Sequence, residues 1–273
     1  MKKTMIALAL AASAVSGMAH AWTTGDFNGS FDINGTITVD QYKDKWEWMT
    51  GEGLSFEHNI KEMNNDQTKL TITQSKATPI LLGRTKEAFA APAVGVGAIP
   101  VISFTDYAGK TVTLQSSSEA AKGYFDLPMK DAEGANLGNV KVNVTVAGLV
   151  SRSNNDHRAI HQSVESKNNN EIYYGGLVSS VAALANDASS IASKFGNYNH
   201  TALLGQLEAV SDIQAQQLWG KGTANMVHTD NNVSASSYSL GIDQGQIIEA
   251  TFTNPVAKTT QWSAPLNVAV TYN

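Results

Sequence analysis

The chain has 273 residues, no cysteine, a formal net charge of −5 at pH 7, and 42% hydrophobic residues against 16% charged ones. This composition excludes a disulfide-stapled mini-protein, a disordered acidic tail and a nucleic-acid-binding protein. The 22 glycines, the many Ser, Thr and Asn residues and the abundance of Val and Ile favour short strands and turns over a helical bundle. We therefore expect a folded, mainly β protein.

Residues 1–21 have the features of a secretory signal peptide. Two lysines open the segment, residues 5–15 are apolar, and residues 19–21 form a small-x-small cleavage signal. A membrane anchor is the alternative, but it needs about 20 apolar residues and polar sequence resumes at Ser16. We expect cleavage before Trp22 and an acidic, exported chain. Since that chain has no cysteine, its stability must come from core burial or from pairing with another chain.

Both ends of the expected mature chain alternate between apolar and polar residues, which is typical of strands with one buried face. Residues 26–40 carry two glycines on the apolar face, where close approach of another backbone is the usual reason for glycine. Residues 262–272 repeat the pattern. Chain ends fray unless a sheet holds them, so the pattern indicates a sheet whose edges are used. The apolar face of the first segment consists of Phe27, Gly29, Phe31, Ile33, Gly35, Ile37 and Val39.

Short strands are also expected between the two ends, with turn residues separating several of them. Their number and spacing are typical of an antiparallel β-sandwich of immunoglobulin type. The expected strands span residues 69–73, 99–104, 111–114, 140–147 and 247–252.

The middle of the chain, at about residues 149–232, reads as a partly helical insertion. Residues 151–170 are strongly polar, and apolar residues then recur at three- and four-residue steps over 178–195 and again over 203–213. Each of these two patterns predicts a surface helix with one apolar stripe. Candidate residues for the ends of the second helix are Asn199 or Thr201 as its N-cap and Gly220 with Gly222 beyond its C-terminus.

One set of side chains has the spacing of metal ligands. His157, His161 and Glu165 would share one face if their segment were helical, which suits zinc. The competing interpretation is a solvated loop, because the surrounding Asn and Ser residues oppose a helix. We favour the loop and expect no metal and no cofactor.

The chain has no local motif of an enzyme. The GxSxG, HExxH, Walker and dinucleotide-binding patterns are all missing from the sequence. A Ser-His-Asp triad assembled from distant positions would leave no such pattern, because its geometry is tertiary. We expect that the protein is not an enzyme, and a periplasmic hydrolase is the weakest of three functional hypotheses.

Long sequence blocks resemble the FaeG and ClpG family of enterobacterial fimbrial major subunits, the K88 and CS-31A type antigens of the chaperone–usher pathway. The blocks are specific and lie along most of the chain, with the closest likeness at the two ends. They are WTTGDFNGSFDINGTIT with KWEW (22–48), PILLGRTKEAFA (79–90), ISFTDY (102–107), LPMKDAEG (127–134), YYGGL (173–177), IEATF (248–252) and TQWSAPLNVAVTY (260–272).

The resemblance implies an incomplete immunoglobulin-like sandwich that is completed by donor-strand exchange. Residues 22–40 would be the donor strand that fills the groove of the next subunit, and residues 41–273 the pilin domain with its insertion. The adjoining groove edge, which a chaperone would cover first, would consist of Leu266, Val268, Val270 and Tyr272. The implied partners are identical subunits, a periplasmic chaperone and an outer-membrane usher, and the implied location is a cell-surface fimbria. The alternative is that the first strand folds into its own sandwich.

The insertion departs from the family pattern just before YYGG. In lectin-like members this stretch is rich in apolar and aromatic residues that serve galactoside binding, whereas here it reads SVESKNNNEI. A receptor surface for host glycoconjugates would combine polar groups with exposed rings, unless those rings are core residues under the helices. The candidates are Glu171, Tyr173, Tyr174, Tyr198 and Trp219. The leading hypothesis is a structural and adhesive fimbrial subunit, and the alternative is a stand-alone secreted carbohydrate-binding β-sandwich.

Overall fold

A computed structural model describes residues 34–36, 41–178, 184–214 and 217–273. The chain divides into two units, Met1–Thr38 and Val39–Asn273. Of the first unit, residues 34–36 are described, and they are exposed and lie outside helices and strands. The predicted signal peptide and the predicted donor-strand residues Phe27, Gly29, Phe31, Ile33 and Ile37 lie outside the described residues.

The second unit is mainly β, as predicted. In the described part of the chain, ten strands form one large sheet, whose central path runs β1-β3-β11-β8-β12-β2. The strands of this path are β1 (Trp46–Thr50), β3 (Thr78–Thr85), β11 (Ser234–Ile242), β8 (Asn136–Ser153), β12 (Ile247–Phe252) and β2 (Lys69–Thr73). Off the path, β8 also pairs with β7 (Lys122–Lys130) and β9 (Ala159–Val164), while β6 (Gln115–Ser116) pairs with β7 and β10 (Gln217–Gly222) with β9. These pairs are antiparallel except β9 with β10, which is parallel.

A smaller sheet lies against one face of the large one. It consists of β13 (Asn267–Tyr272), β4 (Pro100–Thr105) and β5 (Thr111–Val112) in that order. The two sheets share a hydrophobic core, in which the rings of Phe104 on β4 and Phe125 on β7 meet with centroids 4.8 Å apart. Burial of apolar surface between two sheets is the main source of stability in this architecture.

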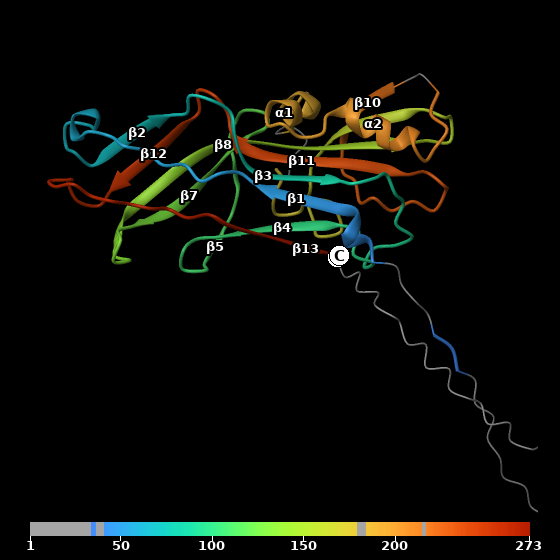
Figure 1. The fold of residues 1–273 in the computed structure, drawn as a ribbon, viewed down its shortest axis with the longest axis horizontal. Coiled ribbons are helices and arrows are strands. Elements are labelled where there is room, and N and C mark those ends of the chain that lie inside the picture. Colours follow the sequence, from blue (N-terminus) through green and yellow to red (C-terminus); the bar gives the residue numbers. More distant parts are fainter. Residues whose placement is uncertain (1–33, 37–40, 179–183, 215–216) are drawn as a thin grey trace, which may run out of the picture. The chain divides into compact units, whose positions relative to one another are not determined.

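Two short helices cover the opposite face of the large sheet (Figure 1). They are α1 (Ala188–Lys194) and α2 (His200–Glu208), and both contact β8 and β11. Leu203 and Leu207 of α2 are fully buried against Leu149 of β8 in a second apolar cluster. Two 3-10 helices, η1 (Tyr42–Lys45) and η2 (Ile60–Glu62), precede and follow β1. No helix among the described residues is long and apolar enough to cross a membrane.

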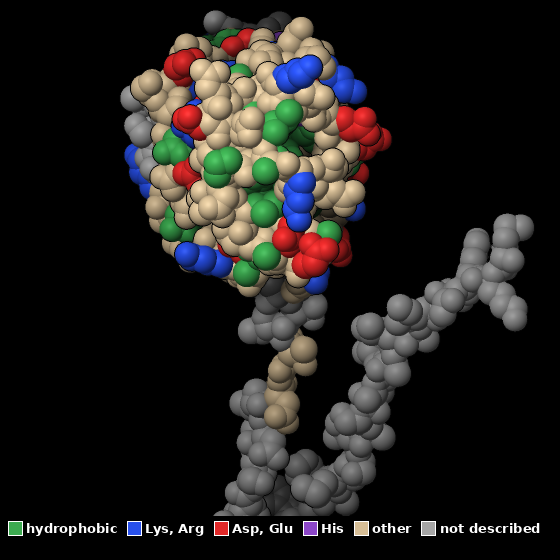
Figure 2. Space-filling view, turned by 90° about the vertical axis from the view of Figure 1, so that its left-hand side faces the viewer, with side chains coloured by type: hydrophobic (Ala, Val, Ile, Leu, Met, Phe, Trp, Pro, Cys, Tyr) green, Lys and Arg blue, Asp and Glu red, His purple; other side chains and the backbone are tan. Residues whose placement is uncertain are grey.

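The long strand β8 contributes side chains to both hydrophobic clusters of the unit. Val140, Val144 and Val146 of β8 are buried on one face, as their alternation predicted, and Val142 is half-buried. Figure 2 views the end of the unit that carries β2 and β12, where small groups of apolar side chains reach the surface among acidic and basic ones.

Three expectations for the middle of the chain need correction. The polar segment 151–170 is not a solvated loop, because β8 runs on to Ser153 and β9 occupies Ala159–Val164. The helix predicted over 178–195 is shorter, since α1 begins after its N-cap Asp187; residues 179–183 lie outside the described part. Asn199 does cap α2, with its side chain accepting from the Ala202 amide, but α2 ends at Glu208. Gly220 and Gly222 lie in β10 instead of ending the helix.

Candidate functional site

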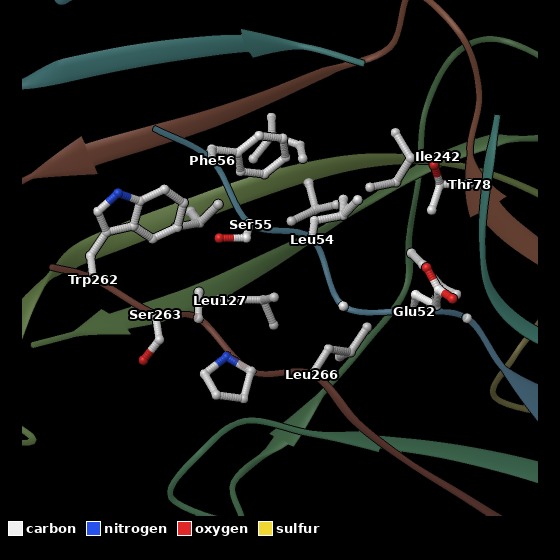
Figure 3. A pocket seen from close by; sticks show the side chains of 18 of the residues that line it. Glu52, Leu54, Ser55, Phe56, Thr78, Leu127, Ile242, Trp262, Ser263 and Leu266 are labelled. Carbon is white, nitrogen blue, oxygen red and sulfur yellow. The ribbon is translucent and has the colours of Figure 1, made fainter. Parts of the chain in front are cut away.

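A groove of about 1000 Å³ opens between the segment that follows β1 and the segment that leads into β13. Residues 50–57 line one side and residues 260–268 the other. Figure 3 shows Leu54 and Phe56 on the first side, Trp262 and Leu266 on the second, and Leu127 between them. The floor comes from the large sheet and is apolar: it consists of Leu127 of β7, Val140 and Val142 of β8, Ile248 of β12 and Ile242 of β11.

The first side of the groove is extended chain without strand pairing among the described residues. Gly51 donates its amide to the Ile80 carbonyl at 3.1 Å, and residues 52–57 then leave the sheet. Leu54 has 40% of its surface exposed, and Phe56 is half-buried. An apolar side chain exposed at the rim of an apolar groove favours burial by a further chain.

The second side continues into a sheet edge. In the described part of the chain β13 pairs with β4 alone, with Val268 opposite Phe104 and Val270 opposite Ile102. The four predicted edge residues alternate with exposed ones and pack against the core: they are Leu266, Val268, Val270 and Tyr272. The backbone groups on the other edge of β13 are therefore available to pair with an added strand.

The five receptor-binding candidates lie in different surroundings. Tyr173 is fully buried beside Trp46, Trp48 and Tyr238 in the core between the sheets, and its hydroxyl shares a hydrogen bond of 2.6 Å with Ser236. Burial raises the pKa of Tyr173. This ring has no surface on which a sugar could stack.

The remaining candidates reach the surface, although they do not form one cluster. Tyr174 has 39% of its surface exposed, while Tyr198 is half-buried under the Arg84 guanidinium, 3.9 Å from the ring centroid. The Glu171 carboxylate accepts hydrogen bonds from the Lys167 amide and the Asn168 side chain. Trp219 on β10 has 57% of its surface exposed.

Trp219 lies on two histidine rings. Its indole is 4.9 Å from the His161 ring of β9 and 5.1 Å from the His200 ring of α2, and the two imidazoles are 5.4 Å apart. His161 is fully buried, with Nδ1 bonded to Ser151 at 2.7 Å and Nε2 to Gln217 at 3.1 Å. Burial and, less strongly, the neighbouring His200 lower the pKa of His161 to about 4. The His161 imidazole under the indole is thus neutral at pH 7.

The three residues with zinc-ligand spacing do not come together. His157 is exposed in the β8–β9 turn, whereas His161 is committed to Ser151 and Gln217. Glu165 is buried and pairs with Lys167 at 3.0 Å. Among the described residues, no three His, Cys, Asp or Glu side chains are grouped as a metal site would need. Sequence reasoning did not pair His161 with His200, whose ring contacts it in the structure. The two residues are 39 positions apart, on β9 and α2, and no local motif connects them.

Comparison with known proteins assigns the class of molecule. A family model described as "Fimbrial, major and minor subunit" matches residues 1–273. Over the full length of both chains, the protein is 48% identical to K88 fimbrial protein AC and 49% identical to K88 fimbrial protein AD of Escherichia coli. It is 29% identical to the F41 fimbrial protein of Escherichia coli, again over both full lengths.

The chain belongs to this family of fimbrial subunits. The family resemblance inferred from the sequence blocks is thereby confirmed. The protein is exported and is a structural component of cell-surface fimbriae. Its relatives are fimbrial proteins rather than enzymes.

Proposed function

We propose that this protein is a major fimbrial subunit that polymerises by donor-strand exchange, with residues 22–40 of one copy filling the groove of the next. The observation that carries the proposal is the apolar groove beside β13, whose outer edge has no strand partner among the described residues. An extended segment that adds to such an edge gains main-chain hydrogen bonds along its length and side-chain pockets at alternate positions. The segment 26–40 has this alternation.

Energetics support an intermolecular strand as the source of stability in a chain without cysteine. Phe27, Phe31, Ile33 and Ile37 would each bury a large apolar side chain, at roughly 1.5–3 kcal/mol apiece and on the order of 6–12 kcal/mol together. Gly29 and Gly35 would let the donor backbone approach the groove closely.

Charge substitution in the donor segment tests the proposal. Ile33→Asp places a carboxylate in the apolar groove and should abolish or strongly reduce filaments seen by electron microscopy of the cell surface. Asn34→Asp is the matched control, because Asn34 lies on the opposite face of the alternating segment. Equal filament numbers from both variants would contradict the proposal and would support the alternative in which the first strand folds into its own sandwich.

We propose that a periplasmic chaperone binds the same groove before assembly and that an usher acts during assembly. An open sheet edge beside an apolar groove is prone to aggregation. A chaperone that pairs with β13 would cover both until the usher delivers the next subunit. This part of the proposal rests on the edge of β13 that no described strand pairs with, and on the half-buried apolar face behind it.

We also propose that the subunit adheres to host glycoconjugates through the surface around Trp219. An exposed indole held by two rings offers a flat face on which a sugar can stack. Trp219→Ala should lower the binding of purified fimbriae to epithelial cells, while filament assembly stays normal. Val210→Ala is the control, since Val210 is similarly exposed at 54% just after α2. Unchanged binding by Trp219→Ala would exclude this surface.

A further inference from the structure

A second pocket, of about 470 Å³, lies on the face of the β8–β9 hairpin opposite the helices. Val150 and Arg152 of β8 and Gln162 of β9 form one wall. Their neighbours in sequence, Ser151 and His161, point to the other face, where His161 meets Trp219. Because strand residues alternate between faces, the pocket is separate from the indole surface.

Residues 223–230 form the other wall, and backbone hydrogen bonds hold this segment in place. Ala91 donates to the Met226 carbonyl at 3.1 Å and accepts from the His228 amide at 3.0 Å, and the Ile172 amide donates to Ala224 at 2.9 Å. Met226 is buried and has a left-handed backbone with φ of 61°. A bulky residue keeps this conformation only where its surroundings fix it. The wall is therefore preorganised.

The lining is polar. Besides the guanidinium of Arg152, it presents the side-chain amides of Gln162 and Asn225 and the hydroxyls of Thr223 and Thr229. Pockets for apolar ligands are lined mainly by hydrophobic and aromatic side chains. This pocket instead offers donors and acceptors in the mixture that a hydroxylated ligand needs. Its volume suits a ligand of one or two sugar rings.

The lining of the pocket carries one cation, Arg152, and one carboxylate, Asp230. The Arg152 guanidinium forms no ion pair or hydrogen bond with any described residue, whereas Arg84 pairs with Glu47. His228 bonds Ser234 through Nε2 at 2.7 Å, and burial lowers its pKa, so it is neutral at pH 7. The Asp230 carboxylate accepts from Asn232 and lies 3.9 Å from His228 Nδ1. Among the described residues, Asp230 is thus engaged by Asn232, whereas the Arg152 guanidinium forms no ion pair with it and remains available to an acidic group.

We propose that this pocket binds an acidic saccharide, with Arg152 holding the carboxylate or sulfate group and the amide and hydroxyl side chains holding the sugar hydroxyls. A guanidinium presents a planar fork of donors that matches an acidic group with two oxygens. The fimbrial location makes the pocket accessible to such groups outside the cell. The inference extends the proposed adhesion to a second site and depends on neither the groove nor Trp219.

Purified fimbriae of the full chain test the inference. Binding of three soluble probes is measured by calorimetry: 3′-sialyllactose, 3′-sulfogalactose and neutral lactose. Arg152→Gln should weaken binding of an acidic probe about tenfold or more, because a charge-assisted hydrogen-bonded pair is lost. Lactose binding should not change. The acidic probe that binds more tightly tells whether the site takes a carboxylate or a sulfate.

The matched control is Arg158→Gln, which removes the same charge from the same hairpin outside the pocket. It should leave binding of the acidic probes unchanged. Equal weakening by both variants, or acidic probes that bind no better than lactose, would overturn the inference. Trp219→Ala should retain the Arg152-dependent binding even if it abolishes adhesion to cells, so failure of the indole surface and failure of this pocket are distinguishable.

Discussion

The Trp48 indole donates a hydrogen bond of 2.8 Å to the Tyr272 hydroxyl, across 224 positions of the chain. Trp48 lies on β1, the first strand after the segment 22–40, and Tyr272 lies near the end of β13. The bond joins the edge strand of the small sheet to the edge strand of the large one. The bond thereby fixes the distance between β1 and β13. The groove lies between the segment that follows β1 and the segment that precedes β13.

We predict that Tyr272→Phe destabilises the fold by about 1 kcal/mol, because the half-buried Trp48 N–H loses its acceptor while the ring packing is kept. Thermal unfolding of the purified chain measures the effect as a lower Tm. Tyr124→Phe is the control, since Tyr124 is also half-buried and its ring lies under Lys141. An equal Tm for the two variants would show that the Trp48–Tyr272 bond adds nothing.

A second prediction concerns the close packing of Trp48 on β3. A Cβ atom at Gly83 would overlap the six-membered ring of Trp48. We expect Gly83→Ala to lower the free energy of unfolding by roughly 1–3 kcal/mol, since core overpacking costs that much. Gly205→Ala, in the middle of α2 with open space around it, should instead raise it by about 0.5–1 kcal/mol. Chemical denaturation of both variants checks the opposite signs.

The strands with clean alternation were predictable from the sequence. The expected strands at 69–73 and 247–252 coincide with β2 and β12, and the C-terminal strand was expected from 262 but begins at Asn267, after Pro265. Proline cannot donate to a sheet ladder, which explains the later start.

The central strand β11 could not be read from the sequence, because it is rich in serine and yet buried on both faces. Its serines are satisfied by distant groups: Ser236 by Tyr173 and the Leu149 carbonyl, and Ser237 by the Tyr198 carbonyl. Such partners arise only from tertiary packing. The same holds for β9, whose buried His161 is satisfied by Ser151 and Gln217. The polar sequence around His161 therefore indicated a solvated loop, whereas the structure has a buried strand with a hydrogen-bond network there.

Acid should destabilise the protein through His161. Its pKa is about 4 in the fold against an ordinary value of 6.5, so the unfolded chain binds a proton there that the folded chain rejects. Stability from this group is complete above pH 6.5 and is lost progressively down to about pH 4, by up to ~3 kcal/mol. Unfolding in denaturant at pH 7 and pH 4.5 measures the loss. In His161→Gln, which keeps a donor for Gln217, the loss between the two pH values should be smaller; an identical loss would assign it to other groups.

The apolar face of β13 supplies the next prediction, which rests on the proposed chaperone. Val268→Asp, Val270→Asp and Tyr272→Ser should each abolish capture by the chaperone and lead to degradation in the periplasm, because the altered side chains face the core and the groove end. Thr271→Asp, on the exposed face of the same strand, should be captured normally. The yield of periplasmic complex is the measurement, and normal yields from the first three variants would contradict the proposal.

The groove floor offers a test of polymerisation within the folded unit itself. Val142 of β8 is half-buried on the floor of the groove. The apolar face of the segment 26–40 carries only Phe, Gly, Ile and Val, so none of its side chains could pair with a charge at this position. Val142→Asp should therefore reduce filament length and number, since each added subunit would bury an unpaired carboxylate at a cost of several kcal/mol. Asn139→Asp introduces the same group at an exposed position of β8 and should leave filaments normal. Electron microscopy counts the filaments, and immunoblotting of the exported chain verifies that both variants reach equal amounts. Normal filaments from Val142→Asp at equal amounts would show that the assembling strand does not enter this groove.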